Sequence, residues 1–160
     1  FSPPPPPPPE SVASRGLGDV YKRQNVDKAE ELLKEQGIAS AAKKAGRDTD
    51  QGLIETYIHS GGRIGAMVEV NCETDFVART QEFSDLAHDI AMQVAAMNPL
   101  TVEEKKPDTA NNEEVENSSL LQQPFIKDPS KNIQELINET VGKLGENIRV
   151  RRFQRFSLGE

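Results

Sequence analysis

The feature that most constrains the fold is a change of hydrophobic period around residues 71–79. Residues 63–71 alternate between apolar and polar side chains, which is the pattern of a half-buried strand. Beyond this stretch, apolar residues recur at helical spacing from Phe83 to Met97. The chain therefore passes from strand to helix at this corner, where an acid, Asp75, stands beside a large aromatic residue, Phe76. A corner of this kind can direct side chains outward.

Composition narrows the classes of function. Only 35% of the 160 residues are apolar, so part of the chain is expected to lie outside a packed core. The net charge of -7 argues against direct binding of nucleic acid by phosphate neutralisation and favours a protein partner. The single cysteine, Cys72, excludes an internal disulfide and a set of thiolate ligands, and it favours a reducing compartment. No apolar run is long enough to predict a membrane span, which takes about 18 residues.

Residues 1–24 are predicted to form a disordered, proline-rich tail outside the fold. The run Pro3 to Pro9 favours extended polyproline II, and no apolar periodicity follows it. A spacer, a ligand for an aromatic groove and an artefact of how the sequence was obtained are the alternatives. Because the chain begins with Phe1 rather than Met, we expect a fragment or a processed product.

Residues 25–47 are predicted to be a small helical segment. Asp27 is a suitable N-cap, Leu32 and Leu33 supply a short apolar stripe, and Gly37 is expected to end the helix in the left-handed conformation. A second helical piece is expected over residues 38–45. Because this stripe has little apolar surface, residues 25–37 are expected to be poorly packed.

Residues 48–160 are predicted to form an α+β domain with a small antiparallel sheet. Two strands, residues 53–59 and 63–71, flank the turn Ser60-Gly61-Gly62 and predict a hairpin. Ile54 and Ile58 are assigned to the core face together with Val68 and its neighbours. A helix over residues 80–97, capped by Thr80, is expected to cover the sheet.

The acidic segment at residues 100–119 has the composition of a mobile loop. After it, Asn132 and Gly145 delimit a helix over residues 132–144. The chain then closes with a strand over residues 148–158, in which Phe153 is out of phase with Phe156 and predicts a bulge. The arginines of this strand are interpreted as a charged outer face or a guarded sheet edge.

The sequence contains no recognisable catalytic constellation. The two histidines, His59 and His88, lack partners at metal-ligand spacing, so they are interpreted as surface or boundary residues, and neither a metal nor a cofactor is predicted. The glycines at positions 61–65 lie inside a hairpin and open no helix, which argues against a phosphate loop. Cys72 is best explained as a small residue at a strand end.

The corner itself, Thr74-Asp75-Phe76-Val77, has two interpretations. In the first, Thr74 and Asp75 satisfy backbone donors at the start of a helix, and Phe76 extends the core stripe of the following helix. In the second, the corner is an exposed contact point that combines an acid and an aromatic ring. Composition and periodicity leave both interpretations open.

The corner also resembles a known signature. The segment Val-Glu-Val-Asn-Cys-Glu-Thr-Asp-Phe-Val-Ala-Arg, residues 68–79, is similar to the signature of the elongation factor Ts family, the guanine-nucleotide exchange factors of elongation factor Tu. The resemblance extends over residues 25–160 and favours the compact cyanobacterial or plastid-like form. Further similar segments are residues 37–47, 57–63, 123–128 and 144–148.

The resemblance implies that Thr74, Asp75, Phe76 and Val77 form a tip that enters the GTPase domain of GDP-bound elongation factor Tu. There the tip would displace magnesium and release GDP without covalent catalysis. Residues 25–47 would be the remnant of an amino-terminal helical domain, which implies an amino-terminally truncated member, and a homodimer could complete the core. The implied compartment houses bacterial-type translation: a plastid, a mitochondrion or the bacterial cytoplasm. The alternative is a truncated, exchange-inactive interaction fragment of the same family.

Overall fold

The computed structural model of the chain describes residues 2–4, 12–103 and 119–160. It divides the chain into two compact units, residues 1–33 and residues 34–160. Most of the proline run lies outside the described residues, and so do residues 104–118 of the predicted acidic loop. Within the described part, no helix is both long and apolar enough to cross a membrane.

The first helix, α1 (Val12–Lys44), is longer than the sequence suggested. Two expectations are wrong here, since α1 begins well before residue 25 and continues through Gly37 instead of stopping there. The second error has a packing cause. Gly37 is buried, and a Cβ atom at this position would lie only 3.1 Å from the backbone oxygen of Asn138 in the helix α5 (Ile133–Leu144). Gly37 therefore serves close helix contact, while Leu32 and Leu33 are 54% and 62% exposed.

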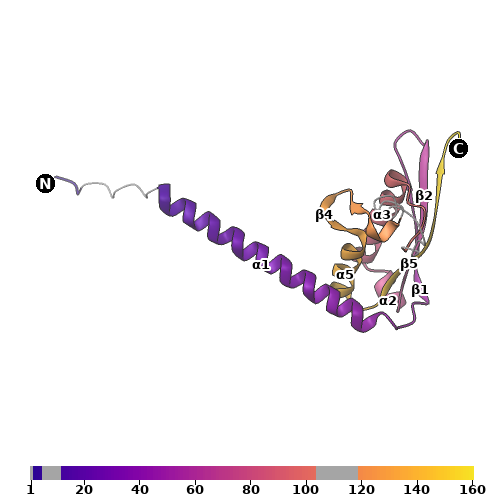
Figure 1. Cartoon of the computed structure of the whole chain (residues 1–160), viewed down its shortest axis with the longest axis horizontal. Helices are drawn as coiled ribbons and strands as arrows, with labels where there is room; N and C mark the ends of the chain where they lie inside the picture. Colours follow the sequence, from indigo (N-terminus) through magenta and orange to yellow (C-terminus); the bar gives the residue numbers. More distant parts are fainter. Residues whose placement is uncertain (1, 5–11, 104–118) are drawn as a thin grey trace, which may run out of the picture. The chain divides into compact units, whose positions relative to one another are not determined.

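The fold is α+β, as the sequence predicted. The strands β1 (Gln51–Ile58), β2 (Ile64–Cys72) and β5 (Ile148–Ser157) form an antiparallel sheet in the order β1-β2-β5. The helices α3 (Gln81–Met97) and α5 lie on one side of this sheet (Figure 1). Among the described residues, no helix covers the other broad face of the sheet, where Ile58 and Phe156 are exposed.

The hairpin was predicted correctly, but its first strand was assigned to the wrong face. Leu53 pairs with Val70 and Tyr57 with Ala66, so these residues of β1 face the core. Ile54 and Ile58 lie on the outer face and are 60% and 66% exposed. Since side chains alternate along a strand, a shift of one residue in the pairing exchanges the two faces completely.

The predicted irregularity in the last strand is confirmed. Val150 pairs with Val70 and Arg152 with Glu69, so the register shifts and Arg151 is the extra residue of a bulge. After the bulge, Phe153 pairs with Val68 on the core face. The extra residue thus explains how Val150 and Phe153, three positions apart, both face the core. Phe156 lies on the outer face and is exposed.

Both covering helices begin and end where their capping residues predicted. Thr80 accepts a hydrogen bond from the Phe83 N–H at the start of α3, and Asn98 ends that helix in the left-handed conformation. In the same way, Asn132 and Gly145 delimit α5. The helix α3 supplies much of the core, and each of its large side chains contributes about 1.5–3 kcal/mol when fully buried. Its buried apolar residues are Phe83, Leu86, Ala87, Ile90, Ala91, Val94 and Ala95.

A short segment before α5 was not predicted. It consists of a 3-10 turn (Leu120–Gln122) and a small hairpin of β3 (Pro124–Phe125) and β4 (Asp128–Asn132). The buried Gln93 of α3 holds this segment, since its side-chain amide donates to the Pro124 carbonyl at 3.1 Å and its oxygen accepts from the Ile126 N–H at 3.0 Å. A buried amide with satisfied partners can fix a loop that has little apolar content.

Candidate functional site

The corner between β2 and α3 contains a separate single-turn helix, α2 (Asp75–Ala78). Thr74 is its N-cap, with its hydroxyl oxygen 3.4 Å from the Val77 N–H, and Val77 is buried. The ring of Phe76 points the other way and is 87% exposed. The interpretation in which Phe76 extends the core stripe is therefore wrong: Phe83 is buried in the core, but Phe76 is not.

Asp75, the first residue of α2, forms a local ion pair with Arg79, the residue that caps the carboxyl end of this helix. The carboxylate of Asp75 lies 2.7 Å from the guanidinium of Arg79, one helical turn later, and both side chains are largely exposed. At the surface such a pair contributes little to stability. It does hold the two side chains together beside the exposed ring, so the outer surface of the corner presents a phenyl group flanked by a carboxylate and a guanidinium.

Thr80 fixes α2 to the long helix that follows. Its hydroxyl donates to the Val77 carbonyl at 2.8 Å and accepts from the Phe83 N–H at 3.3 Å. One side chain therefore bonds to a carbonyl at the end of α2 and satisfies an N–H at the start of α3 that has no partner within that helix. The position of the exposed ring is thus tied to a helix that is packed in the core.

A loop distant in sequence holds the other end of α2. The carboxylate of Glu146 accepts from both the backbone N–H and the hydroxyl of Thr74, at 2.9 Å and 2.6 Å. In the opposite direction, the carboxylate of Glu73 accepts from the Asn147 N–H at 2.6 Å. Sequence reasoning missed this reciprocal arrangement, which we call the Glu73–Asn147 clasp, because its partners lie 72 and 74 positions apart. In the sequence, Glu146 and Asn147 stand out only as members of a segment, residues 144–148, that resembles the elongation factor Ts family.

The sequence model of a family described as Elongation factor TS matches residues 22–117. Elongation factor Ts of Syntrophomonas wolfei is 45% identical over 166 aligned residues, which cover 85% of this chain and 78% of the relative. Elongation factor Ts of Thermoanaerobacter sp. strain X514 is also 45% identical, over 85% of this chain and 81% of the relative. Elongation factor Ts of Desulfosudis oleivorans is 40% identical, over 85% of this chain and 84% of the relative. The chain belongs to the elongation factor Ts family.

Membership of the elongation factor Ts family makes this protein a translation elongation factor, and the relatives named above are bacterial. The resemblance of residues 68–79 to this family is thereby confirmed. The resemblance to the compact cyanobacterial or plastid-like form stays a prediction.

The single cysteine of this elongation factor Ts family member lies beneath the corner. Cys72 is fully buried, and its thiol donates to the Thr74 carbonyl at 3.1 Å. Burial, together with the nearby negative charge of Glu146, raises the pKa of the Cys72 thiol to about 11. At neutral pH the group is a thiol rather than a nucleophilic thiolate, so its role here is packing and hydrogen bonding.

The histidines lie at the end of the sheet near the hairpin turn. The hydroxyl of Tyr57 is 3.2 Å from Nδ1 of His59, and the Tyr57 ring meets the ring of His88 edge-on with centroids 5.8 Å apart. Among the residues that the structure describes, no three His, Cys, Asp or Glu side chains could together hold a metal ion.

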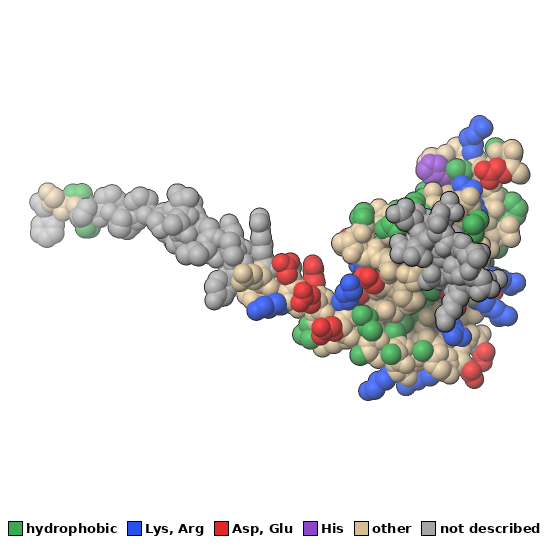
Figure 2. Space-filling model, viewed as in Figure 1, with side chains coloured by type: hydrophobic (Ala, Val, Ile, Leu, Met, Phe, Trp, Pro, Cys, Tyr) green, Lys and Arg blue, Asp and Glu red, His purple; other side chains and the backbone are tan. Residues whose placement is uncertain are grey.

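The arginines of β5 make separate local contacts. Arg151 and Arg152 pair with Glu69 of β2, and Arg155 donates to the Ala95 carbonyl at the end of α3. Burial raises the pKa of Glu69, but hydrogen bonds from Asn71 and Arg152 and the nearby arginine charges outweigh it, so this pKa is lowered. On the face drawn in Figure 2, acidic, basic and hydrophobic side chains are intermingled over residues 34–160.

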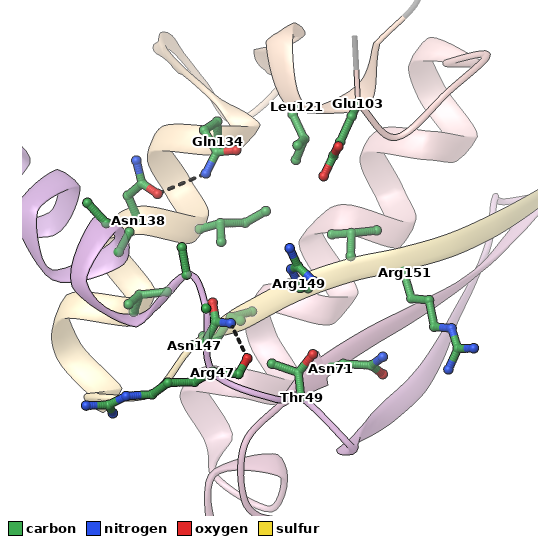
Figure 3. A pocket seen from close by; sticks show the side chains of 18 of the residues that line it. Arg47, Thr49, Asn71, Glu103, Leu121, Gln134, Asn138, Asn147, Arg149 and Arg151 are labelled. Atoms are coloured by element: carbon green, nitrogen blue, oxygen red, sulfur yellow. Dashed lines mark hydrogen bonds between the residues drawn. The ribbon is translucent and has the colours of Figure 1, made fainter. Parts of the chain in front are cut away.

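A cavity of about 1040 Å³ lies between the end of α1, the linker before β1, and the elements α5 and β5. The side chains of Glu103, Leu121 and Arg149 point into it (Figure 3). Its lining mixes apolar residues with charges of both signs. No sequence signal predicted this cavity, because its walls come from segments far apart in the chain.

Proposed function

We propose that this protein promotes the release of GDP from elongation factor Tu, and that the corner residues Thr74–Val77 form the tip that acts near the nucleotide. Family membership supports the partner and the exchange reaction. The observation that carries the assignment of the tip is the 87% exposure of the Phe76 ring, since an aromatic side chain of this size is normally buried in its own domain.

The proposed mechanism acts on the magnesium ion of elongation factor Tu. A bound magnesium ion shields the negative charges of a nucleoside diphosphate, and its ligands tolerate little change in geometry. A rigid ring inserted nearby displaces the groups that hold the ion. Without the ion, phosphate repulsion is less compensated and GDP dissociates faster.

Thermodynamic linkage then accounts for the turnover of the complex. If this protein weakens GDP binding by a given factor, GDP weakens the binding of this protein to elongation factor Tu by the same factor. Rebinding of nucleotide therefore releases the exchange factor. The proposal requires no covalent step and no cofactor on this chain.

The test follows the release of fluorescently labelled GDP from elongation factor Tu with three forms of the full chain: unchanged, Phe76→Ala and Leu100→Ala. Leu100 is a suitable control because it is also an exposed apolar residue, at 75%, and it lies outside the corner, three residues after the end of α3. We expect the unchanged chain and Leu100→Ala to accelerate release equally. Phe76→Ala should reduce the acceleration at least about tenfold, the effect of losing a central aromatic contact.

Two outcomes would contradict the proposal at different points. If the unchanged chain binds elongation factor Tu but leaves GDP release at its spontaneous rate, the protein is the exchange-inactive interaction fragment that the sequence analysis kept as the alternative. If Phe76→Ala accelerates release as much as the unchanged chain does, the exchange function stands and the assignment of the tip is wrong.

In this proposal the protein also pairs with a second copy of itself through the uncovered face of the sheet. Ile58 and Phe156 lie opposite each other across Gly65, and both are about two-thirds exposed, at 66% and 69%. Met67 lies on the same face two residues along β2 and is 49% exposed. Two such faces would bury apolar side chains that the single chain leaves in water. The proposed compartment is one that houses bacterial-type translation.

A further inference from the structure

The helix that carries Phe76 cannot hold its own geometry. It has four residues, and a single helical turn is unstable in isolation because nucleation fixes several dihedral angles for one hydrogen bond. The orientation of the ring must therefore be set by contacts from outside the helix. Thr80 supplies them at the carboxyl end, and Glu146 supplies them at the amino end.

The contact between Glu146 and Thr74 also controls the cap itself. A threonine hydroxyl has one proton and two lone pairs. Because the hydroxyl proton is donated to the Glu146 carboxylate at 2.6 Å, the lone pairs of the same oxygen are free to accept from the Val77 N–H. The carboxylate thus selects the hydroxyl orientation in which Thr74 can cap α2. Bonds of this charge-assisted kind are roughly twice as strong as neutral ones.

The Glu73–Asn147 clasp also connects the corner to the linker before β1. The side-chain amide of the buried Asn147 donates to the Arg47 carbonyl at 2.9 Å, and the guanidinium of Arg47 lies 3.6 Å from the Glu73 carboxylate. Figure 3 shows Asn147 and Arg47 joined at the wall of the cavity. Two adjacent residues of one loop, Glu146 and Asn147, therefore bind both the cap of α2 and the linker.

We propose that Glu146 is a positioning residue for exchange: it orients the Thr74 cap and thereby holds the Phe76 ring in the direction in which it acts. This inference rests on the proposed function. The simpler reading is that Glu146 only stabilises the fold. The two readings differ in what they predict for the ring, since a purely stabilising residue would leave the ring's local mobility unchanged in the folded protein.

The first measurement compares exchange by the unchanged chain, Glu146→Gln and Glu139→Gln at saturating elongation factor Tu. The glutamine can still accept from the Thr74 N–H, but its amide group donates to the Thr74 hydroxyl oxygen and competes with the Val77 N–H. We expect the maximal rate to fall about tenfold, the loss of one charged hydrogen bond, with a smaller change in the concentration that gives half the maximal rate. Glu139 of α5, which pairs with Lys131 of β4, supplies the matched control, and Glu139→Gln should leave both values unchanged.

The second measurement reads the ring directly. The chain has no tryptophan, so Phe76→Trp introduces a single tryptophan at the tip, which can be excited selectively over the two tyrosines. In the free protein, we expect the Glu146→Gln background to increase the fast component of the tryptophan anisotropy decay, and the Glu139→Gln background to leave it unchanged. Unchanged anisotropy together with an unchanged exchange rate would overturn the role of Glu146.

The variants at position 74 keep the test decisive if Glu146→Gln does not fold. Thr74→Ser retains the hydroxyl that caps α2, whereas Thr74→Val removes it, so we expect exchange by Thr74→Val to be about tenfold slower than exchange by Thr74→Ser. Equal activity of these two variants would contradict the inference. Failure of the unchanged chain to accelerate GDP release would instead contradict the proposed function, so the two failures are distinguishable.

Discussion

At the scale of single residues, the sequence located the corner but not the direction of its side chains. The positions of Thr74–Val77 follow from the change of hydrophobic period, and the cap at Thr74 follows from its residue type. Whether Phe76 is buried depends on which residue fills the core beside it, and spacing alone allowed both arrangements. The Glu146 contact was beyond prediction, because a bond between residues 72 positions apart leaves no local pattern.

The buried thiol gives a prediction about pH. Because the pKa of Cys72 is raised from its ordinary value of 9.0 to about 11, the folded chain keeps its proton where the unfolded chain loses it. The resulting stabilisation is complete below pH 9 and is lost as the pH rises toward about 11. We therefore expect iodoacetamide at pH 8 to alkylate the urea-unfolded chain readily and the native chain very slowly. Similar rates in both states would contradict the assigned burial.

At the scale of elements, capping residues predicted boundaries better than periodicity predicted faces. The ends of α3 and α5 match their capping residues, since a cap bond involves only neighbouring residues. The exposed positions of Ile54 and Ile58 depend on pairing with another strand and were assigned incorrectly. Gly37 was misread for a related reason. A glycine favours both a helix end and a close helix crossing, and only the neighbouring helix decides between them.

Two glycines at this crossing provide a matched test. A Cβ atom at Gly142 of α5 would lie 3.6 Å from the Gly37 Cα, an ordinary contact, whereas one at Gly37 would press on the backbone of α5 at 3.1 Å. Gly142→Ala should therefore raise the free energy of unfolding by about 0.5–1 kcal/mol, the helix-propensity gain. Gly37→Ala should lose this gain because the helices must separate. Urea unfolding followed by circular dichroism measures both, and equal stabilisation would show that α1 is not closely packed at Gly37.

At the scale of the whole molecule, the fold class was predictable because each element carries its own period and caps. The three-stranded sheet and its covering helices appear in the expected chain order. The small hairpin of β3 and β4 escaped prediction, since it is held by the buried Gln93 rather than by an apolar pattern of its own. The outer face of the sheet shows the opposite error: Ile54 and Ile58 were assigned to the core, and the structure leaves both exposed on this face.

The proposed pairing of two copies is tested through this face. Sedimentation equilibrium at tens of micromolar should give the mass of a dimer for the unchanged chain. Ile58→Asp should give a monomer, because two carboxylates would be placed in the apolar interface without partners. Leu100→Asp is the matched control and should remain dimeric, since Leu100 is also exposed but belongs to none of the strands β1, β2 and β5. A monomeric unchanged chain would contradict the pairing.

The burial of Cys72 has a practical consequence for studying motion in this protein. It is the only thiol in the sequence, and the folded chain shields it completely. A cysteine introduced at an exposed position outside the tip, such as Leu100→Cys, would accept a maleimide dye or a nitroxide spin label while the native cysteine is left untouched. Distances to a second label on a binding partner could then be measured without first removing a side chain that supports the corner.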